Sequence, residues 1–325
     1  PIFGPTRGAA RLEGSKAFAR VLMSHLGIPT PRFALCDNAD RAAYLARTQR
    51  WARVFKADGI AYGKGVRVTE RFGDVEAALE AILVDNVYGL ESDRIVVEER
   101  LVGEEITVFA LTDGYDLAIM GHVHNHPRLL DGEGGPPTRG MGQVCPAPQV
   151  TPQMLTRIEE VVLRPTLEEL VERGTPLRGA LFVDFMLVKG EPYALDYNVR
   201  FGDPATQTIL SGYSGDVYRA LAACLERGQL LQAVSELARD PRPRVSVVVA
   251  CEGYPDRYAR GDAIDVQGRI FEERTDLLLF EDGVRTTERG PESTGGRAFT
   301  VVAAGSTVED ARTLAYQGVE AIQFR

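Results

Sequence analysis

Residues 180–200 read ALFVDFMLVKGEPYALDYNVR, and this stretch decides the fold. Its apolar segments, residues 180–188 and 193–199, are joined by KGEP, a pattern that predicts a β-hairpin. Each strand carries one acid among apolar residues, and a turn centred near Gly190 places Asp184 opposite Asp196. Like charges directly opposite one another destabilise a sheet, so the pair needs a partner that relieves the repulsion.

The side-chain period of two places Asp196, Asn198 and Arg200 on the same face of their strand. Together with Asp184, this face carries two carboxylates, an amide and a guanidinium. Hard cations prefer oxygen ligands, commonly one or two carboxylates plus substrate phosphates. The hairpin therefore predicts a Mg2+ (or Mn2+) site next to phosphates, with Asp184, Asp196 and Asn198 as ligands. A solvated hairpin face is the alternative interpretation.

Two further segments carry charge beside predicted strands. Residues 56–66 read KADGIAYGKGV, with glycines that let backbone N–H groups approach a phosphate and lysines that supply positive charge. The segment lacks the G-x-x-x-x-G-K-[ST] spacing of a P-loop, and a hairpin turn with solvated lysines is the alternative. Residues 95–107 read IVVEERLVGEEIT, a buried type of strand that runs into four acids. On its own, this run also suits a solvated acidic turn.

Length and composition indicate a multi-domain enzyme. The chain has 325 residues, 44% hydrophobic and 26% charged, whereas single domains usually have ~100 to 200 residues. The net charge of −9 argues against a nucleic-acid partner. No apolar run approaches the ~20 residues of a membrane helix, and the first residues do not resemble a signal segment. We expect a cytoplasmic monomer or homodimer that acts on small molecules, without nucleic-acid or membrane partners.

Apolar spacing predicts a helix over 14–26, with Lys16 in its first turn. Short strands and helices then alternate between 31 and 101, in an α+β unit small enough to be a lid. Its expected strands are 32–35, 53–57, 66–68 and 95–99, and its expected helices are 39–48 and 74–84. Strands over 106–120 lead into a Gly- and Pro-rich loop over 127–148, and such long loops are usually functional. After these we expect a helix over 152–173, the hairpin, a helix over 217–226, a linker at 240–244, then strands and a closing helix over 307–317.

Short motifs spread over nearly the whole chain resemble the ATP-grasp superfamily and, within it, the glycinamide ribonucleotide synthetase (phosphoribosylamine–glycine ligase) family. The matching runs are FGPT (3–6), LEGSKAF (12–18), KADG (56–59), GKGV (63–66), VEE (97–99), GEE (103–105), GMG (140–142), Asn198 with RFGDP (200–204), GYP (253–255) and GGR (295–297). The resemblance implies a mixed α+β (α/β) ATP-grasp fold with a lid subdomain and a smaller, β-rich C-terminal domain. It divides the chain into the start of the ATP-grasp core (1–30), after a missing N-terminal domain, the lid (31–101), the catalytic core (102–239) and the C-terminal domain (240–325).

The resemblance also implies roles for individual residues. Lys16 and Lys56 are expected to contact the ATP phosphates, and Asp196 and Asn198 to ligate Mg2+, although the family has Glu in place of Asp196. The remaining expected ATP contacts are a loop closing over the phosphates (Gly63, Lys64, Gly65), a hinge that binds adenine (Glu98, Glu99, Leu101) and an acid that binds ribose (Glu105).

The implied reaction is the ADP-forming ligation of a carboxylate to an amine, as in purine biosynthesis. A substrate carboxylate attacks the γ-phosphate of ATP, and an amine captures the acyl phosphate. Such a transfer needs positioning and charge neutralisation more than covalent chemistry from the protein. Arg200 is expected to hold the acyl phosphate or the attacking carboxylate, as a catalytic residue beside Asp196 and Asn198.

The departures from the family concentrate among the expected substrate contacts. The family run S-Q-D-H-K-R is VHNHPR here (123–128), Arg139 replaces the first Gly of T-G-G-M-G, and residues 271–275 replace H-A-G-T. Asp184 also stands where this family usually has Gly. The expected substrate residues are Asn125, His126, Arg128, Arg139, Gly140, Met141, Gly142 and Asp203.

These departures keep other interpretations open. One is a diverged paralogue that joins a different amino acid and amine in specialised metabolism. Another is a non-catalytic nucleotide-binding regulator or subunit. The alternating His122, His124 and His126 also permit a zinc site if they share one strand face.

Overall fold

The computed structural model describes residues 2–59, 65–69, 71, 73–83, 94–288 and 290–324. The chain divides into two compact units. The first unit comprises Pro1–Ile119, Thr151–Arg200 and Arg219–Ala233, and the second comprises Met120–Val150, Phe201–Tyr218 and Val234–Arg325. In the described part of the chain, no helix is both long and apolar enough to cross a membrane.

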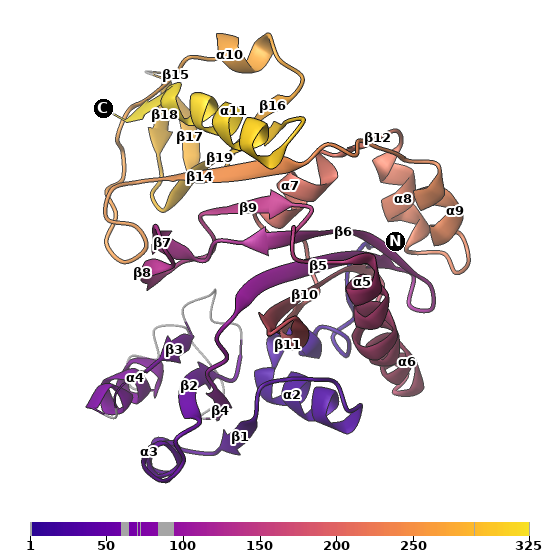
Figure 1. The fold of residues 1–325 in the computed structure, drawn as a ribbon, viewed down its shortest axis with the longest axis vertical. Helices are drawn as coiled ribbons and strands as arrows, with labels where there is room; N and C mark the ends of the chain where they lie inside the picture. The colour runs from indigo at the N-terminus through magenta and orange to yellow at the C-terminus, as the bar shows by residue number, and fades with distance from the viewer. Residues whose placement is uncertain are drawn as a thin grey trace. The chain divides into compact units, whose positions relative to one another are not determined.

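A small sheet backed by helices lies in the stretch of the first unit where a lid was predicted (Figure 1). Its strands follow the order β1-β4-β2-β3, and every neighbouring pair is antiparallel. Both helices pack on it around buried Phe55, Ile95 and Val97, and Asn38 caps the first of them by accepting from Arg41 N–H. The elements are β1 (Phe33–Cys36), α3 (Ala39–Thr48), β2 (Ala52–Ala57), β3 (Val66–Val68), α4 (Gly73–Leu83) and β4 (Ile95–Glu99).

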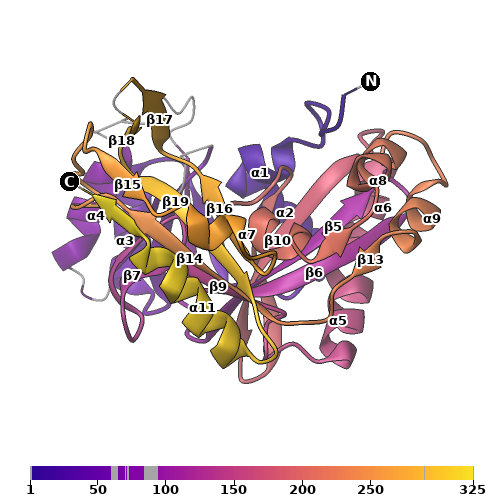
Figure 2. The same cartoon turned by 90° about the horizontal axis from the view of Figure 1, so that it is seen from above.

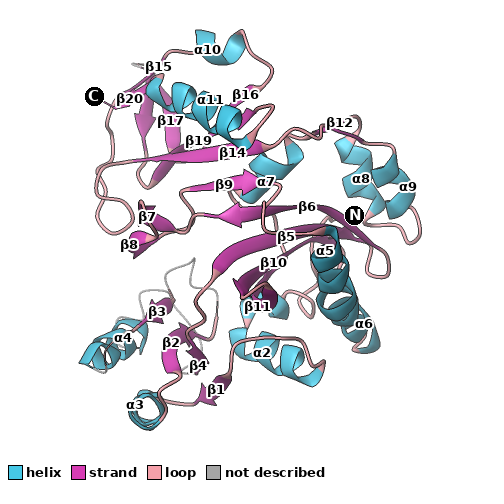
Figure 3. Ribbon diagram, in the orientation of Figure 1, coloured by secondary structure: helices cyan, strands magenta, loops and turns pink. Residues whose placement is uncertain are grey.

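The predicted hairpin is the second sheet region of the first unit. The strand β10 (Gly179–Val188) pairs with β11 (Glu191–Asn198) on one side and with β5 (Glu104–Thr112) on the other, all antiparallel. A helical run covers this sheet and appears as one continuous cyan rod in Figure 3. It consists of α5 (Pro152–Ile158), a π-helical segment (Glu159–Leu163) and α6 (Arg164–Glu172). The short α1 (Arg11–Gly14) and α2 (Lys16–His25) precede the small sheet.

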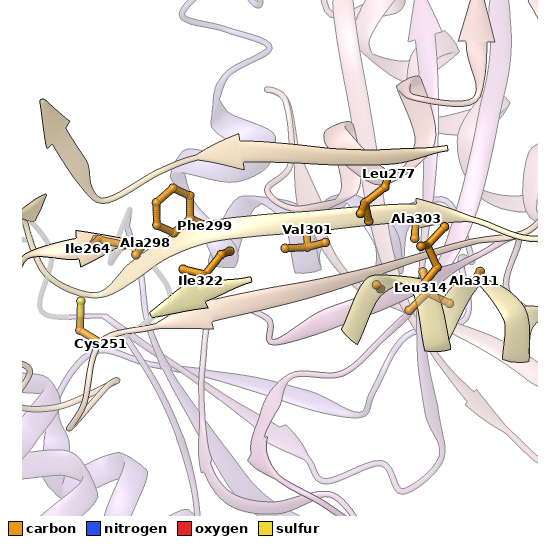
Figure 4. Packing of buried hydrophobic residues seen from close by; sticks show 12 residues of the cluster. Cys251, Ile264, Leu277, Ala298, Phe299, Val301, Ala303, Ala311, Leu314 and Ile322 are labelled. Atoms are coloured by element: carbon orange, nitrogen blue, oxygen red, sulfur yellow. The ribbon is translucent and has the colours of Figure 1, made fainter. Parts of the chain in front are cut away.

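The second unit is built on five strands, which neighbour one another in the order β6 (Leu117–Asn125), β9 (Gly142–Cys145), β14 (Arg244–Ala250), β19 (Arg297–Ala304) and β16 (Leu277–Glu281). The helix α11 (Val308–Glu320) packs on one face of this sheet, as Figure 2 shows, and begins with a capping box formed by Thr307 and Asp310. Figure 4 shows the buried core on that face, in which Val301, Leu277 and Leu314 meet. The helix α7 (Ala205–Leu210) packs on the opposite face, where the Thr208 hydroxyl donates to Ser246 at 2.9 Å.

The strand β6 starts in the first unit, and the other elements of the second unit are mostly short. They are β7 (Arg128–Leu130), β8 (Gly134–Pro137), β12 (Tyr213–Ser214), β13 (Ala238–Arg239), β15 (Ile264–Val266), α10 (Arg269–Glu272), β17 (Val284–Thr287), β18 (Gly290–Ser293) and β20 (Ile322–Phe324). The helices α8 (Val217–Ala223) and α9 (Leu230–Ser235) each contain residues of both units.

Most predicted elements are found within a few residues of their expected bounds, but three expectations were wrong. The Gly- and Pro-rich stretch 127–148 is not one long loop, because it contains the hairpin β7–β8 and the strand β9. Gly132 and Gly135 provide the positive φ angles, 64° and 74°, that this hairpin needs. The expected helix 152–173 is interrupted by the π-helical segment, and the expected helix 14–26 is divided at Ser15. The four-part domain division stays a prediction.

Candidate active site

The hairpin register is the one that the sequence predicts: Asp184 is the direct partner of Asp196. The neighbouring Tyr197 points to the opposite face, where it is 2% exposed and shares a 2.7 Å hydrogen bond with Thr166 of α6. One face of the hairpin is thus closed by a helix. The acids lie on the other face, where they meet polar groups of the first unit.

Lys56 of β2 lies against Asp196. Its ammonium is 2.8 Å from the Asp196 carboxylate and 3.2 Å from that of Glu98, while its side chain is only 6% exposed. Burial by itself raises the pKa of Asp196, but the cations Lys56, Arg20 and Lys16 outweigh this effect and hold the pKa below its usual range. Asp196 is therefore ionised at neutral pH.

Asp184 is stabilised in a different way from its partner. It accepts hydrogen bonds from the Thr107 hydroxyl and, at 2.9 Å, from the Asn198 side-chain amide. Burial raises the pKa of Asp184 to about 6, with a further rise from Asp196 that the two hydrogen bonds and Arg200 oppose. Each of the two carboxylates thus has its own partners, and the two differ in how readily they ionise.

A buried arginine completes this charge network. Arg20 of α2 is 1% exposed and donates to the Glu98 carboxylate at 2.6 Å. It also donates to the backbone carbonyls of Ala194 and Leu195 in β11. Arg20 therefore links the helix, the strand that carries Asp196 and the acid that holds Lys56.

Lys16 lies at the start of α2, beside the loop that follows β2. Its ammonium donates to the Gly59 carbonyl at 3.1 Å, and Ser15 caps the helix by accepting from the Phe18 N–H. Asp58 accepts from both the Ser15 hydroxyl (2.8 Å) and the Ala17 N–H (3.2 Å), so the loop is fastened to the helix N-terminus. Burial lowers the pKa of Lys16, and Lys56 acts in the same direction.

Arg200 follows directly after the hairpin and is partly occupied by protein groups. Its guanidinium is paired with Glu13 at 2.9 Å and donates to the Asn198 side-chain oxygen at 3.4 Å. Glu13 also accepts from the Val199 N–H at 3.0 Å. More than half of the Arg200 side chain is exposed, so it remains accessible to a ligand.

The structure says less about the other residues that are expected to bind ATP. The Glu98 side chain is buried in the ion pairs with Arg20 and Lys56, so only its backbone is available to a nucleotide. Glu99 is held by a hydrogen bond from its N–H to the Arg32 carbonyl, Leu101 follows β4, and Glu105 lies in β5 opposite Met186. The Gly65 carbonyl accepts from the Ala57 N–H at 2.9 Å, whereas Gly63 and Lys64 lie outside the described residues.

The donor set of the hairpin suits a hard cation. Asp184, Asp196 and Asn198 bring carboxylate and amide oxygens to one face, which is what Mg2+ prefers when phosphates complete its coordination. Within the part of the chain that the structure describes, no group of three or more His, Cys, Asp or Glu residues is arranged to hold a metal. The three histidines in particular show no such arrangement, and His122 accepts from the Ala147 N–H through Nδ1.

The residues expected to bind substrate all belong to the second unit, whereas the residues expected to bind ATP belong to the first. Asn125 is buried and accepts from the Gln143 side chain at 2.9 Å. His126 lies 3.8 Å from Glu133, and Arg128 donates to the Gly135 carbonyl at 2.9 Å. Both contacts join residues that lie close together in the sequence, between positions 126 and 135.

A second set of these residues gathers around Arg297. The side chain of this arginine is 3% exposed and pairs with Asp203 at 2.7 Å, and it also donates to the Arg139 carbonyl at 3.2 Å. Gly140, Met141 and Gly142 follow, and the Met141 N–H donates to the His126 carbonyl at 2.9 Å. The structure thus joins Arg139 and Asp203 through a residue that the sequence marked only as part of a matching run.

Sequence reasoning missed other members of the site. Arg20, Glu13 and Asp58 received no role, although Glu13 and Asp58 lie inside the matching runs 12–18 and 56–59. Their position next to Lys16 and Lys56 was the available signal. Arg20 gave no such signal, because its partner Glu98 is distant in the sequence.

Comparisons with known proteins show which family the chain resembles. The family model "Phosphoribosylglycinamide synthetase, ATP-grasp (A) domain" matches residues 14–206, and the corresponding "C domain" model matches residues 244–325. Biotin carboxylase from Campylobacter jejuni has the same fold, with a TM-score of 0.76 at 15% identity, over 99% of this chain and 69% of that one. The protein is therefore an ATP-grasp enzyme.

Nearer relatives make the assignment specific. Phosphoribosylamine–glycine ligase from Ralstonia nicotianae is 38% identical over 324 residues, which cover 99% of this chain and 75% of the relative. The crystal structure of phosphoribosylamine–glycine ligase from Thermotoga maritima superimposes with a TM-score of 0.84 at 32% identity, over 99% of this chain and 79% of that one. The chain belongs to the phosphoribosylglycinamide synthetase (phosphoribosylamine–glycine ligase) family. It is accordingly an ATP-dependent carbon–nitrogen ligase of that type.

Proposed function

We propose that this ligase joins a carboxylate to an amine through an acyl phosphate, in the site formed by the β10–β11 hairpin and the two lysines. A carboxylate oxygen of the substrate attacks the γ-phosphorus of ATP, and the bond between that phosphorus and the β–γ bridging oxygen breaks as ADP leaves. The amine nitrogen then attacks the acyl carbon, phosphate leaves, and the nitrogen loses a proton. The observation that carries this proposal is the cluster of Lys16, Lys56 and Arg20 around Asp196.

In this proposal, each residue positions charge and none forms a covalent bond. Lys16 and Lys56 bind phosphate oxygens, and Arg200 holds the attacking carboxylate or the acyl phosphate. The backbone of Glu98, Glu99 and Leu101 binds adenine, Glu105 binds ribose, and the loop of Gly63, Lys64 and Gly65 covers the phosphates.

Asp184, Asp196 and Asn198 would hold Mg2+ or Mn2+. When bound, this cation supplies positive charge that neutralises the phosphate oxygens during transfer. The Asp196 carboxylate is already ionised, and the Asn198 side chain lies between Asp184 and Arg200, where it orients both.

For the substrates, glycine and phosphoribosylamine are the first candidates, because both nearer relatives are named for that reaction. A different amino acid and amine form the second candidate. The exposed Arg139 and the buried amide of Asn125 favour it, since they change the charges among the expected substrate residues Asn125, His126, Arg128, Arg139, Gly140, Met141, Gly142 and Asp203. A cytoplasmic location remains a prediction from the sequence.

Release of phosphate from ATP across a panel of amino acids, each with and without phosphoribosylamine, tests the proposal. Release only with glycine plus phosphoribosylamine supports the first candidate, and release with another pair supports the second. If no pair releases phosphate although the protein binds ATP, the ligase proposal fails and a nucleotide-binding regulator takes its place.

A further inference from the structure

Two neighbouring cavities lie in the second unit, where α7 ends and β14 begins. Their volumes are about 270 and 210 Å³. Both are lined by the same five residues, Gly212, Tyr213, Asp240, Arg242 and Arg244. Met120, Pro146 and Ile209 add apolar surface to the larger cavity. None of these residues has a role in the proposed ligase reaction, so that reaction leaves the two cavities unexplained.

Arg244, the first residue of β14, is the buried cation of these cavities. Its side chain is 7% exposed, pairs with the Asp240 carboxylate at 2.8 Å and donates to the carbonyls of Arg242 (2.9 Å) and Asp240 (3.4 Å). A Cβ on Gly212 would lie 3.0 Å from its Nη1 atom, so the guanidinium packs directly on the glycine. A guanidinium has five N–H donors, and these three bonds leave donors for a further acceptor.

Asp240 is shared between two arginines. Arg242 pairs with it at 2.8 Å, and hydrogen bonds from Arg242 hold the pKa of Asp240 well below its usual range, with Arg244 acting in the same direction. One carboxylate therefore balances two guanidiniums, which leaves one positive charge. The other acid in the lining, Asp276, does not balance it, because Asp276 pairs with Arg274 at 2.9 Å.

Arg239 of β13 adds a second positive charge to the larger cavity. It is exposed, its guanidinium lies 5.9 Å from the centroid of the Tyr213 ring, and no carboxylate among the described residues pairs with it. The groups that feel its charge are neutral at pH 7: burial lowers the pKa of His122 to about 4 and raises that of Cys145 to about 11. Burial also raises the pKa of Tyr213. In a chain of net charge −9, the cavities thus carry two positive charges without partners.

We propose that the two cavities bind a phosphate monoester, whose phosphate contacts Arg239, Arg242 and Arg244 and whose apolar body lies against Tyr213 and Ile209. A phosphate monoester carries roughly two negative charges at neutral pH, which matches the two unbalanced cations, whereas a carboxylate carries one. Guanidiniums bind phosphate oxygens through parallel hydrogen bonds. This site is additional to the proposed ligase reaction and does not depend on it.

Isothermal titration of the full chain tests the ligand class, with phenyl phosphate as the probe. Phenol is its neutral counterpart, and inorganic phosphate lacks the apolar body. We expect phenyl phosphate to bind at least ~10-fold more tightly than either one, because charged hydrogen bonds and burial of the ring each contribute at least that factor. Phenyl phosphate that binds no more tightly than phenol, or no more tightly than inorganic phosphate, overturns the inference.

Arg239→Gln should weaken the binding of phenyl phosphate ~10-fold or more, because it removes a charged donor. Arg242→Gln should act similarly, since it leaves Arg244 balanced by Asp240. Both arginines are exposed, so the variants should keep the far-UV circular dichroism of the wild type. Arg312→Gln is the matched control, because Arg312 is an arginine of the same unit, 59% exposed on α11. Unchanged affinity in Arg239→Gln, or an equal loss in Arg312→Gln, overturns the inference.

Hydrogen exchange followed by mass spectrometry locates the bound probe. Phenyl phosphate should slow the exchange of backbone amides in residues 209–214 and 238–246 of the wild type, but not in Arg239→Gln. Protection confined to other segments would contradict the proposed site. MgATP is titrated into the same samples, and Arg239→Gln should bind it as the wild type does. A parallel loss of MgATP binding would mean that the probe occupies the nucleotide site, which also overturns the inference.

Discussion

Asp196 is the residue on which the proposed chemistry depends most. Asp196→Ala removes one carboxylate from the hairpin face but leaves Lys56 paired with Glu98 at 3.2 Å, so no buried cation is stranded. We expect kcat to fall by roughly 100-fold or more, the usual effect of losing a charge-stabilising group. The melting temperature should change little.

Asp196→Asn is the control for this variant, because it keeps the side-chain volume and removes only the charge. Both variants should retain the far-UV circular dichroism of the wild type. Wild-type turnover in either of them would refute the role of the Asp196 carboxylate.

Unlike Asp196, Arg20 is expected to contribute to the stability of the fold and to the positioning of its neighbours. Removing its guanidinium strands the buried Glu98 carboxylate and two carbonyls of β11, and breaking a buried pair on one side costs about 3–5 kcal/mol. Arg20→Ala should therefore lower the free energy of unfolding by that amount in urea titrations, and Arg20→Lys should recover part of it.

Arg47 provides the comparison for Arg20. It pairs with Glu76 at 3.0 Å, but both side chains are more than half exposed. Exposed pairs contribute about 0–1 kcal/mol, so Arg47→Ala should unfold nearly as the wild type does. Similar losses in Arg20→Ala and Arg47→Ala would contradict the interpretation of Arg20 as a buried link.

At the scale of elements, α6 contacts β11 on the face of the hairpin that is opposite to Asp184 and Asp196. The Thr166 hydroxyl donates to the Val162 carbonyl in the π-helical segment at 2.6 Å and meets the Tyr197 hydroxyl at 2.7 Å. Thr166→Val leaves the Tyr197 hydroxyl buried without a partner, which costs about 1–3 kcal/mol.

A double-mutant cycle in urea isolates this contact. Tyr197→Phe removes the orphaned hydroxyl, so the double variant should be more stable than the sum of the two single changes predicts. Strict additivity would show that the two hydroxyls do not interact in solution.

Sequence periodicity was sufficient to predict most helices and strands, but not which distant segments they contact. The hairpin register followed from a short turn and alternating side chains, and the structure confirms the pairing of Asp184 with Asp196. The hairpin β7–β8 was missed because its Gly and Pro residues resemble a loop, although positive φ angles at glycines are what such a turn requires. The π-helical segment has no distinctive periodicity in the sequence.

The site was predictable where residues lie close together in short motifs. Lys16 and Lys56 were found from such motifs, and the structure places both near Asp196. The link from Arg20 to Glu98 joins positions 78 residues apart, and Arg20 occupies an ordinary position in a predicted helix. No local pattern reveals that it is buried. The roles assigned to the site residues remain proposals.

For the whole molecule, ligand binding should be visible as stability. A ligand that binds only the folded state stabilises it by about 2.7 kcal/mol at 100 times its Kd. MgATP should therefore raise the melting temperature by a few degrees. Lys16→Met should remove most of this rise, because it deletes a cation that we propose binds a phosphate oxygen, while keeping an apolar stem of similar length.

Lys189 serves as the control lysine, since it is exposed in the turn of the β10–β11 hairpin. Lys189→Met should show the full rise in melting temperature with MgATP. An equal rise in Lys16→Met would exclude Lys16 from the nucleotide site.

In the proposed site, Lys56 joins phosphate binding to cation binding through the Asp196 carboxylate beside it. A lysine ammonium has three donors, so a phosphate oxygen can share Lys56 with Asp196 and Glu98 without displacing either. Free ATP would bring only negative charge next to these carboxylates, whereas ATP complexed with a divalent cation brings both signs. We therefore expect binding of the nucleotide and binding of the cation to be thermodynamically coupled, each increasing the affinity for the other.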